Sequence, residues 1–130
     1  MVKAVIDTMV WAAALARKSK YHREALEIIA AVDPIITTNI ALELYNVLTR
    51  DLGFSAQDAA ETVWKIMQTT DTMDLQAEHA KQAVRIASEH RISVFDAAIL
   101  TEASMAGAAL VTFDRKLKRI GTALGIHILP

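Results

Sequence analysis

The chain has 130 residues, of which 53 % are hydrophobic and 5 % aromatic, and its formal net charge at pH 7 is −1. This length predicts a single domain, residues 1–130, with an aliphatic core. The absence of cysteine excludes disulfides, zinc–thiolate centres and cysteine nucleophiles, and the near-neutral charge excludes a general cationic field for nucleic acid.

Short β-branched runs alternate with segments of helical periodicity along the whole chain. The patterns predict strands at residues 2–6, 35–37, 70–75, 109–113 and 125–129. They predict helices at residues 8–18, 21–32, 39–50, 56–68, 76–90, 94–105 and 115–120. Strands that alternate with helices indicate an α/β fold with a parallel sheet and right-handed crossovers. Such sheets bind ligands at the carboxyl ends of their strands.

The same periodicity predicts which side chains face the core. Trp11 and Trp64 fit apolar stripes and are expected in the core, as is Val84 in the helix 76–90. The four histidines lack metal-ligand spacing and are expected mostly on solvated helix faces or helix ends: His22, His79, His90 and His127.

No apolar run approaches the length of a membrane span, and Asp7 interrupts the apolar start of the chain, so that it does not resemble a signal peptide. The sequence therefore predicts a cytoplasmic protein that does not use a membrane.

Four acidic residues stand where this fold would bring them together, and we call them the acidic quartet: Asp7, Glu43, Asp96 and Asp114. Asp7 and Asp114 each follow a predicted strand, and Asp96 begins a helix. Glu43 lies inside the apolar arc of its helix, where a carboxylate is costly unless it is paired or bound to a cation.

Each of these acids has a structural explanation of its own. Asp7 and Asp114 suit helix N-caps, Ser93 and Asp96 resemble a capping box, and Glu43 would suit a buried ion pair with Lys or Arg. Carboxylates that converge at one edge of a sheet nevertheless favour a site for hard divalent cations such as Mg²⁺ or Mn²⁺. Without a cation the quartet should repel itself and raise at least one pKa.

The chemistry that uses such a site is phosphodiester cleavage. A bound metal ion generates a hydroxide-like nucleophile near neutral pH, and a second ion roughly 3.5–4 Å away stabilises the leaving oxygen. Two basic clusters would suit a polyanionic substrate: Arg17, Lys18, Lys20 and Arg23; and Arg115, Lys116, Lys118 and Arg119. Most of these basic side chains are expected simply to lie on a solvated surface. Arg115 and Lys116 directly follow Asp114, however, and are expected to bind substrate.

Four short motifs resemble those of PIN-domain ribonucleases, specifically the small VapC-type toxins of prokaryotic toxin–antitoxin pairs. In chain order they are Val5-Ile6-Asp7-Thr8, Thr37-Thr38-Asn39-Ile40-Ala41-Leu42-Glu43-Leu44, Phe95-Asp96-Ala97-Ala98-Ile99 and Leu110-Val111-Thr112-Phe113-Asp114-Arg115. The similarity covers essentially the whole chain. One departure is Met9-Val10-Trp11, where a small hydroxyl residue often follows the first motif.

The resemblance implies a three-layer α/β/α, Rossmann-like PIN domain with a central parallel sheet. It implies an endoribonuclease that uses Mg²⁺ or Mn²⁺, in which the acidic quartet supplies both the catalytic residues and the metal ligands. Thr8 and Thr112 would support the site by orienting water or a carboxylate. The expected partners are an RNA substrate, a cognate antitoxin and a second copy of the chain, with residues 21–32 and 55–69 as candidate dimer helices.

Two other functions stay open at this point. The chain could be a non-catalytic PIN-like module that binds RNA or protein, or an RNA-processing PIN nuclease without an antitoxin. A receiver or haloacid-dehalogenase phosphotransfer domain fits poorly. The second of these wants Asp-x-Asp after the first strand, and this chain has Asp7-Thr8-Met9.

Overall fold

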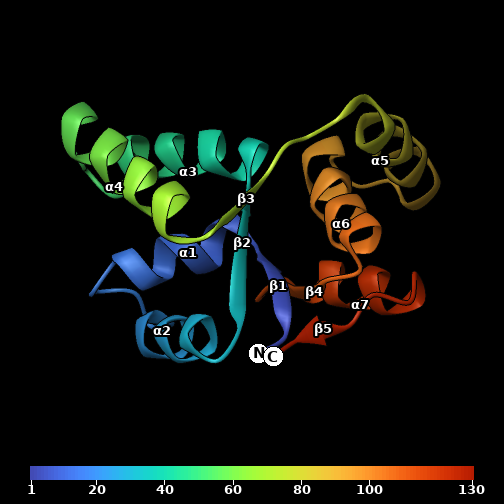
Figure 1. The fold of residues 1–130 in the computed structure, drawn as a ribbon, viewed down its shortest axis with the longest axis horizontal. Coiled ribbons are helices and arrows are strands. Elements are labelled where there is room, and N and C mark those ends of the chain that lie inside the picture. The colour runs from blue at the N-terminus through green and yellow to red at the C-terminus, as the bar shows by residue number, and fades with distance from the viewer.

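The computed structural model describes residues 1–130 and contains one sheet of five parallel strands. The strands are β1 (Lys3–Ile6), β2 (Asp33–Thr37), β3 (Asp71–Met73), β4 (Ala109–Val111) and β5 (Ile128–Leu129). Their order in space is β3-β2-β1-β4-β5 (Figure 1). The chain thus builds outward from β1 in one direction and later returns to its other side. The β1–β4 border is a topological switch point, where open parallel sheets bind ligands.

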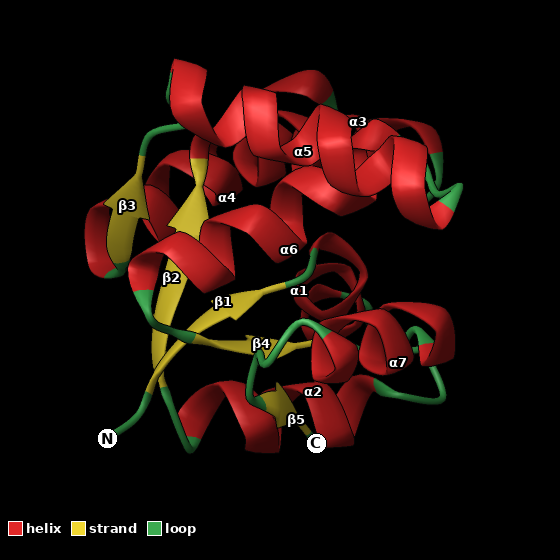
Figure 2. Ribbon diagram, turned by 90° about the vertical axis from the view of Figure 1, so that its right-hand side faces the viewer, coloured by secondary structure: helices red, strands yellow, loops and turns green.

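Seven helices cover both sides of this sheet (Figure 2). They are α1 (Thr8–Leu15), α2 (His22–Ala30), α3 (Thr38–Arg50), α4 (Ala56–Thr69), α5 (Ala77–His90), α6 (Val94–Ala106) and α7 (Arg115–Ala123). The α3–α4 pair and the α5–α6 pair stand on opposite sides of the view in Figure 1. None of the helices combines the length and apolar character needed to cross a membrane.

The core is aliphatic because the central strands are buried on both faces. Ile6, Ile36 and Leu110 from three neighbouring strands are fully buried, and Leu44 and Leu100 reach them from α3 and α6. Each such side chain contributes about 1.5–3 kcal/mol relative to an exposed position. This packed layer holds the ends of β1 and β4 in fixed register, with Ile6 opposite Val111.

Every predicted strand and helix is present, and the expected α/β fold with a parallel sheet is confirmed. Several boundaries differ from the prediction. The first helix ends at Leu15 instead of residue 18, β4 ends at Val111 instead of Phe113, and β5 is confined to Ile128–Leu129. The last helix ends at Ala123 instead of residue 120, and it includes Gly121, which packs closely against its neighbours. A Cβ there would lie 2.6 Å from the Ile128 side chain.

Three expectations about the core are wrong. Trp64 is 61 % exposed and Val84 is also exposed, because α4 and α5 bury mainly smaller side chains such as Val63 and Ala83. His79 is buried instead of solvated. Its Nδ1 accepts a hydrogen bond of 2.8 Å from the Gln76 backbone N–H, as part of a capping box at the start of α5.

Candidate metal centre

Asp7 lies at the carboxyl end of β1 and is only 8 % exposed. It occupies the N-cap position of α1, yet its side chain makes no capping hydrogen bond. Its Oδ2 instead accepts a hydrogen bond of 2.7 Å from the Thr112 hydroxyl, 105 residues further along the chain. The contact exists because β1 and β4 are neighbours, and it places the Asp7 carboxylate at the switch point of the sheet.

Asp114 follows β4 and caps α7. Its Oδ1 accepts from the backbone N–H groups of Lys116 at 2.8 Å and Leu117 at 3.1 Å. Its own backbone N–H donates to the Thr112 hydroxyl at 3.1 Å. Thr112 therefore links two members of the acidic quartet, since it donates to Asp7 and accepts from Asp114.

Asp96 lies in the first turn of α6, where its backbone N–H donates to the Ser93 hydroxyl at 3.1 Å. Partial burial raises the pKa of Asp96, and the negative charges of Asp114 and Glu43 raise it further. The Ser93 hydroxyl and the Lys116 ammonium oppose this rise. The N-terminal turn of α6 therefore shares one electrostatic environment with the end of β4 and with α3.

Burial raises the pKa of Asp7 to about 6, and the charges of Asp96 and Glu43 add to the effect. Hydrogen bonds from the Thr112 side chain and the Thr8 backbone lower this pKa. Together the two perturbed pKa values involve all four members of the quartet as mutually repelling charges. This repulsion is what the sequence predicts for the quartet without a bound cation.

Glu43 differs from the prediction because it is exposed instead of lying within the core. Helix α3 turns Ile40, Leu44 and Leu48 inward, and this leaves Glu43 at the edge of the apolar face. Glu43 lines an open groove of about 320 Å³ together with Phe95 and other residues of α3. Glu43 belongs to the quartet because its charge raises the pKa values of Asp96 and Asp7, and an exposed carboxylate carries no cost of burial.

The basic residues lie around the quartet without forming ion pairs with it. The ion pairs of the structure join Lys3 or Lys81 to other acids. Of the two residues expected to bind substrate, Arg115 and Lys116 are both exposed, and Lys116 is the one whose charge lowers the pKa of Asp96.

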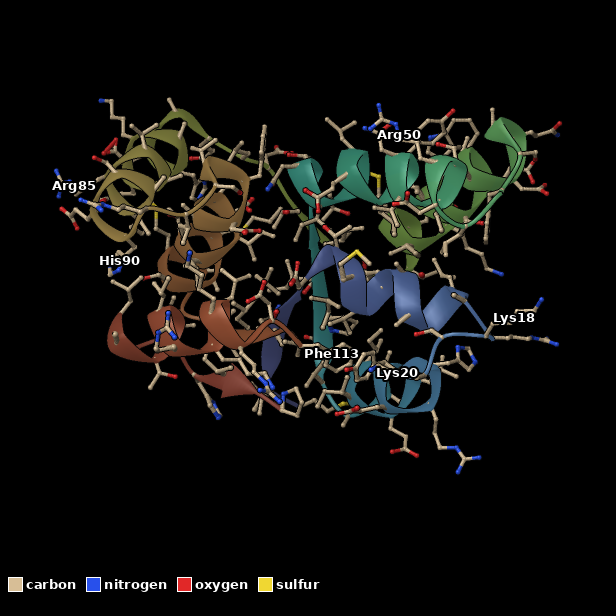
Figure 3. The ribbon with its side chains drawn as sticks, turned by 180° about the vertical axis from the view of Figure 1, so that it is seen from behind. Lys18, Lys20, Arg50, Arg85, His90 and Phe113 are labelled. Atoms are coloured by element: carbon tan, nitrogen blue, oxygen red, sulfur yellow. The ribbon has the colours of Figure 1, made fainter.

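An aromatic pair that sequence analysis missed brings Lys20, from the other basic cluster, near the end of β4. The rings of Tyr21 and Phe113 stack with their centroids 5.2 Å apart, and the Lys20 ammonium lies 5.0 Å from the centre of the Tyr21 ring. Lys20, in the turn between α1 and α2, therefore lies near Phe113, which precedes Asp114, whereas Lys18 lies further out at the edge of the molecule (Figure 3). The two partners are too far apart in the sequence for any local pattern to reveal the pair.

The donor set fits a hard, hydrated cation. No three acidic or histidine side chains stand close enough together to form a ready-made cage around a metal ion. Mg²⁺ needs few such direct ligands, because it keeps several of its waters and is commonly held by one or two carboxylates. Carboxylates that lack basic partners and repel one another are compatible with this arrangement. The Thr8 hydroxyl is buried and makes no hydrogen bond, so only Thr112 contacts a quartet carboxylate as expected.

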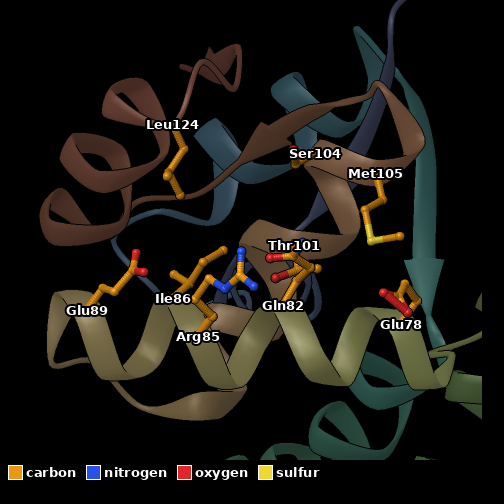
Figure 4. Close-up of a pocket in the computed structure, with 9 residues that line it drawn as sticks. All are labelled: Glu78, Gln82, Arg85, Ile86, Glu89, Thr101, Ser104, Met105 and Leu124. Atoms are coloured by element: carbon orange, nitrogen blue, oxygen red, sulfur yellow. The ribbon is translucent and has the colours of Figure 1, made fainter.

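A hollow of about 330 Å³ lies apart from the quartet, between α5, α6 and the end of α7. Arg85 points into it, with Glu78 and Glu89 on either side along α5 (Figure 4). None of its lining residues belongs to the quartet, so its size does not bear on the chemistry of the acidic edge.

Glu102 is a second feature that sequence analysis missed. It is fully buried in α6, and neither of its carboxyl oxygens has a hydrogen-bond partner of good geometry. Burial raises the pKa of Glu102 to about 7, while the side chains of Asn39 and Thr37 lower it. No other acid contributes to this pKa, so Glu102 is separate from the quartet. The sequence did hold one signal of this burial. Glu102 follows the apolar Ile99 by three residues and so lies on the same face of the helix.

A family model for the PIN domain matches residues 4–123 of the chain. The chain belongs to the PIN-domain family. The sheet order, the acidic edge and this match agree, and the fold is a PIN α/β fold. No curated protein sequence matches significantly.

Solved structures of VapC toxins and toxin–antitoxin complexes share the fold. The chain is similar to Mycobacterium tuberculosis VapC20 with a TM-score of 0.80 and 21 % identity, over 91 % of this chain and 95 % of that one. The chain is also similar to a toxin–antitoxin complex from Klebsiella pneumoniae, with a TM-score of 0.75 and 17 % identity, over 98 % of this chain and 96 % of that one. For the DNA-bound VapBC complex of Salmonella typhimurium the TM-score is 0.74 and the identity 21 %, over 99 % of this chain and 98 % of that one.

Proposed function

We propose that this PIN domain is an endoribonuclease that depends on Mg²⁺ or Mn²⁺ and acts as the toxin of a toxin–antitoxin pair. The observation that supports the proposal most is the electrostatic coupling of the acidic quartet at the β1–β4 switch point. Uncompensated carboxylates raise one another's pKa values and destabilise the fold unless a cation neutralises them. Ionisable groups with strongly perturbed pKa values are common at functional sites.

The residues have distinct roles in this proposal. The quartet holds the divalent ion, and Thr112 keeps Asp7 ionised and oriented through its hydrogen bond. When bound, the ion supplies a water of lowered pKa and neutralises charge on the phosphodiester. Lys116, whose charge already acts on Asp96, attracts the RNA backbone together with Arg115.

The structural relatives support the proposed partners. VapC20 is described as a toxin that cleaves the sarcin–ricin loop, and the Klebsiella and Salmonella relatives are complexes of toxin and antitoxin. We infer that this chain also acts on RNA and binds an antitoxin, with residues 1–130 as one catalytic unit.

A mostly apolar groove of about 390 Å³ between α3 and α4 supports protein partners of this kind. It is flanked by exposed Trp64, and exposed apolar patches commonly mark protein interfaces. We infer a homodimer that uses α2 and α4. A monomeric mass in light scattering at micromolar concentration would contradict it.

The test of the catalytic proposal is RNA cleavage by charge-neutral variants. Glu43→Gln and Asp96→Asn should each lower Mg²⁺-dependent cleavage by about 100-fold or more, since each removes a charge that holds the ion. Both variants should fold, because loss of one carboxylate relieves repulsion. Glu89→Gln on the exposed face of α5, outside the proposed dimer helices, is the matched control and should cleave normally. Cleavage at the wild-type rate by both quartet variants contradicts the proposal.

A further inference from the structure

The groove beside Glu43 has an exposed aromatic residue on its rim. It is lined by Asn39, Leu42, Glu43 and Asn46 from α3 and by Phe95 from the first turn of α6. Phe95 is 67 % exposed and Leu42 is 73 % exposed. Glu43 forms part of the wall, and Asp96 directly follows Phe95, so the groove is continuous with the acidic quartet.

Folding does not require an aromatic residue at position 95. Helix α6 buries seven consecutive residues, Ala97 to Ala103, and these provide its contact with the core. The first turn, with Val94 and Phe95, lies outside that contact and is exposed. A large apolar ring that stays in water forgoes about 1.5–3 kcal/mol of burial. A function in which the ring is covered accounts for its presence there.

We propose that a nucleobase next to the scissile phosphate of the RNA stacks on Phe95 in this groove, with the Asn46 amide at the edge of the base. The proposal rests on the proposed function. Base–aromatic stacking is a common way for proteins to hold single-stranded nucleic acid, and amide side chains read base edges in unpaired RNA. The phosphate would lie at the quartet, while its base would enter the neighbouring groove.

The composition of the groove favours a base over a protein partner. Two of its five lining residues are hydrophobic, and two others are asparagines. In the α3–α4 groove, by contrast, seven of eight lining residues are hydrophobic, which suits a protein partner better. The volume of about 320 Å³ is within the range of small-ligand sites, about 300–1,000 Å³.

The experiment compares three substitutions of Phe95 in steady-state cleavage of single-stranded 12-nucleotide RNAs of random sequence. Phe95→Ala and Phe95→Leu should raise KM by roughly 5- to 150-fold with little change in kcat, because both lose the stacking face. Phe95→Trp should restore the wild-type KM. Leucine keeps an apolar side chain, so a wild-type KM for Phe95→Leu overturns the proposal.

Two further measurements separate this inference from other causes. An altered mass of Phe95→Ala in light scattering would place Phe95 in an interface between copies of the chain and overturn the proposal. If the wild-type protein cleaves no RNA, the proposed function fails. RNA binding, measured by fluorescence anisotropy with the same RNAs in Mg²⁺, then tests the stacking on Phe95. Weaker binding by Phe95→Ala then supports it, and equal binding by Phe95→Ala and wild type overturns it.

Discussion

The fold buries two acidic side chains, Asp7 and Glu102, and they differ in what surrounds them. Burial is the largest cause of the raised pKa of each, to about 6 for Asp7 and about 7 for Glu102. Asp7 also feels two other carboxylates and has a hydroxyl donor, whereas Glu102 feels no other charge and has no well-formed hydrogen bond. The comparison shows that a raised pKa alone does not mark a functional site.

The two carboxyl groups also occupy different parts of the fold. Asp7 lies at the carboxyl end of β1, next to β4, and keeps 8 % of its surface exposed. Glu102 lies in the middle of α6, near Asn39 and Thr37 at the start of α3, and is inaccessible to solvent. We expect Asp7 to act in metal binding and Glu102 to be only a cost to stability above neutral pH.

The largest expected effect comes from Glu102→Gln. The pKa of Glu102 is raised from its ordinary value of 4.5 to about 7, so the folded state binds its proton more tightly than the unfolded state. Its contribution to stability is therefore fully present below pH 4.5 and is lost as the pH rises through 7. At pH 8, Glu102→Gln should be more stable than wild type by about 3 kcal/mol, and at pH 4 the difference should vanish. Urea unfolding at the two pH values measures this.

Glu89→Gln on the exposed face of α5 is the matched control for Glu102→Gln, and its stability should follow that of wild type at both pH values. A Glu102→Gln variant that is less stable than wild type at pH 8 would show that the carboxylate has a favourable partner in solution. The contrast with Asp7 would then disappear.

A slightly smaller effect should come from divalent ions, and it should distinguish the two carboxyl groups. A ligand at 100 times its Kd stabilises the native state by about 2.7 kcal/mol. For a domain of this size the melting temperature should rise by roughly 10 °C. Mn²⁺ should produce this rise in wild type and in Glu102→Gln, and a much smaller one in Asp7→Asn. Equal responses of all three proteins in calorimetry would remove Asp7 from the metal site.

Features that depend on neighbouring residues in the sequence were predicted, whereas most features that depend on contacts between distant residues were not. The starts of α4 at Ala56 and of α6 at Val94, each capped by the preceding serine, depend on neighbours a few residues away, and both starts were predicted. The meeting of Asp7 with the end of β4 was also expected, because parallel sheets bring strand ends to one edge.

Other features depend on surfaces that no local pattern describes. A helical wheel gives the direction of Glu43 and Trp64, but the neighbouring elements decide how much of each is covered, and both proved to be exposed. The stacking of Tyr21 on Phe113 and the approach of Glu102 to Asn39 join residues far apart in the chain. Such contacts depend on the three-dimensional fold and could not be predicted from the sequence.

The smallest expected effect tests the hydrogen bond that gives Asp7 its partner. Thr112→Val keeps the shape of the side chain but removes the donor to Asp7 and the acceptor for the Asp114 N–H. A hydrogen bond to a charged group contributes about 1.5–3 kcal/mol, so stability should fall by about 1.5 kcal/mol near pH 7. Because the Thr112 hydroxyl lowers the pKa of Asp7, its loss should raise that pKa above about 6. Without metal, NMR titration of the Asp7 carboxyl should show this rise, and Thr112→Ser, which keeps the hydroxyl, should leave the pKa nearly unchanged. If Thr112→Val and Thr112→Ser titrate alike, the hydroxyl does not stabilise the Asp7 carboxylate, and burial and its acidic neighbours alone set that pKa.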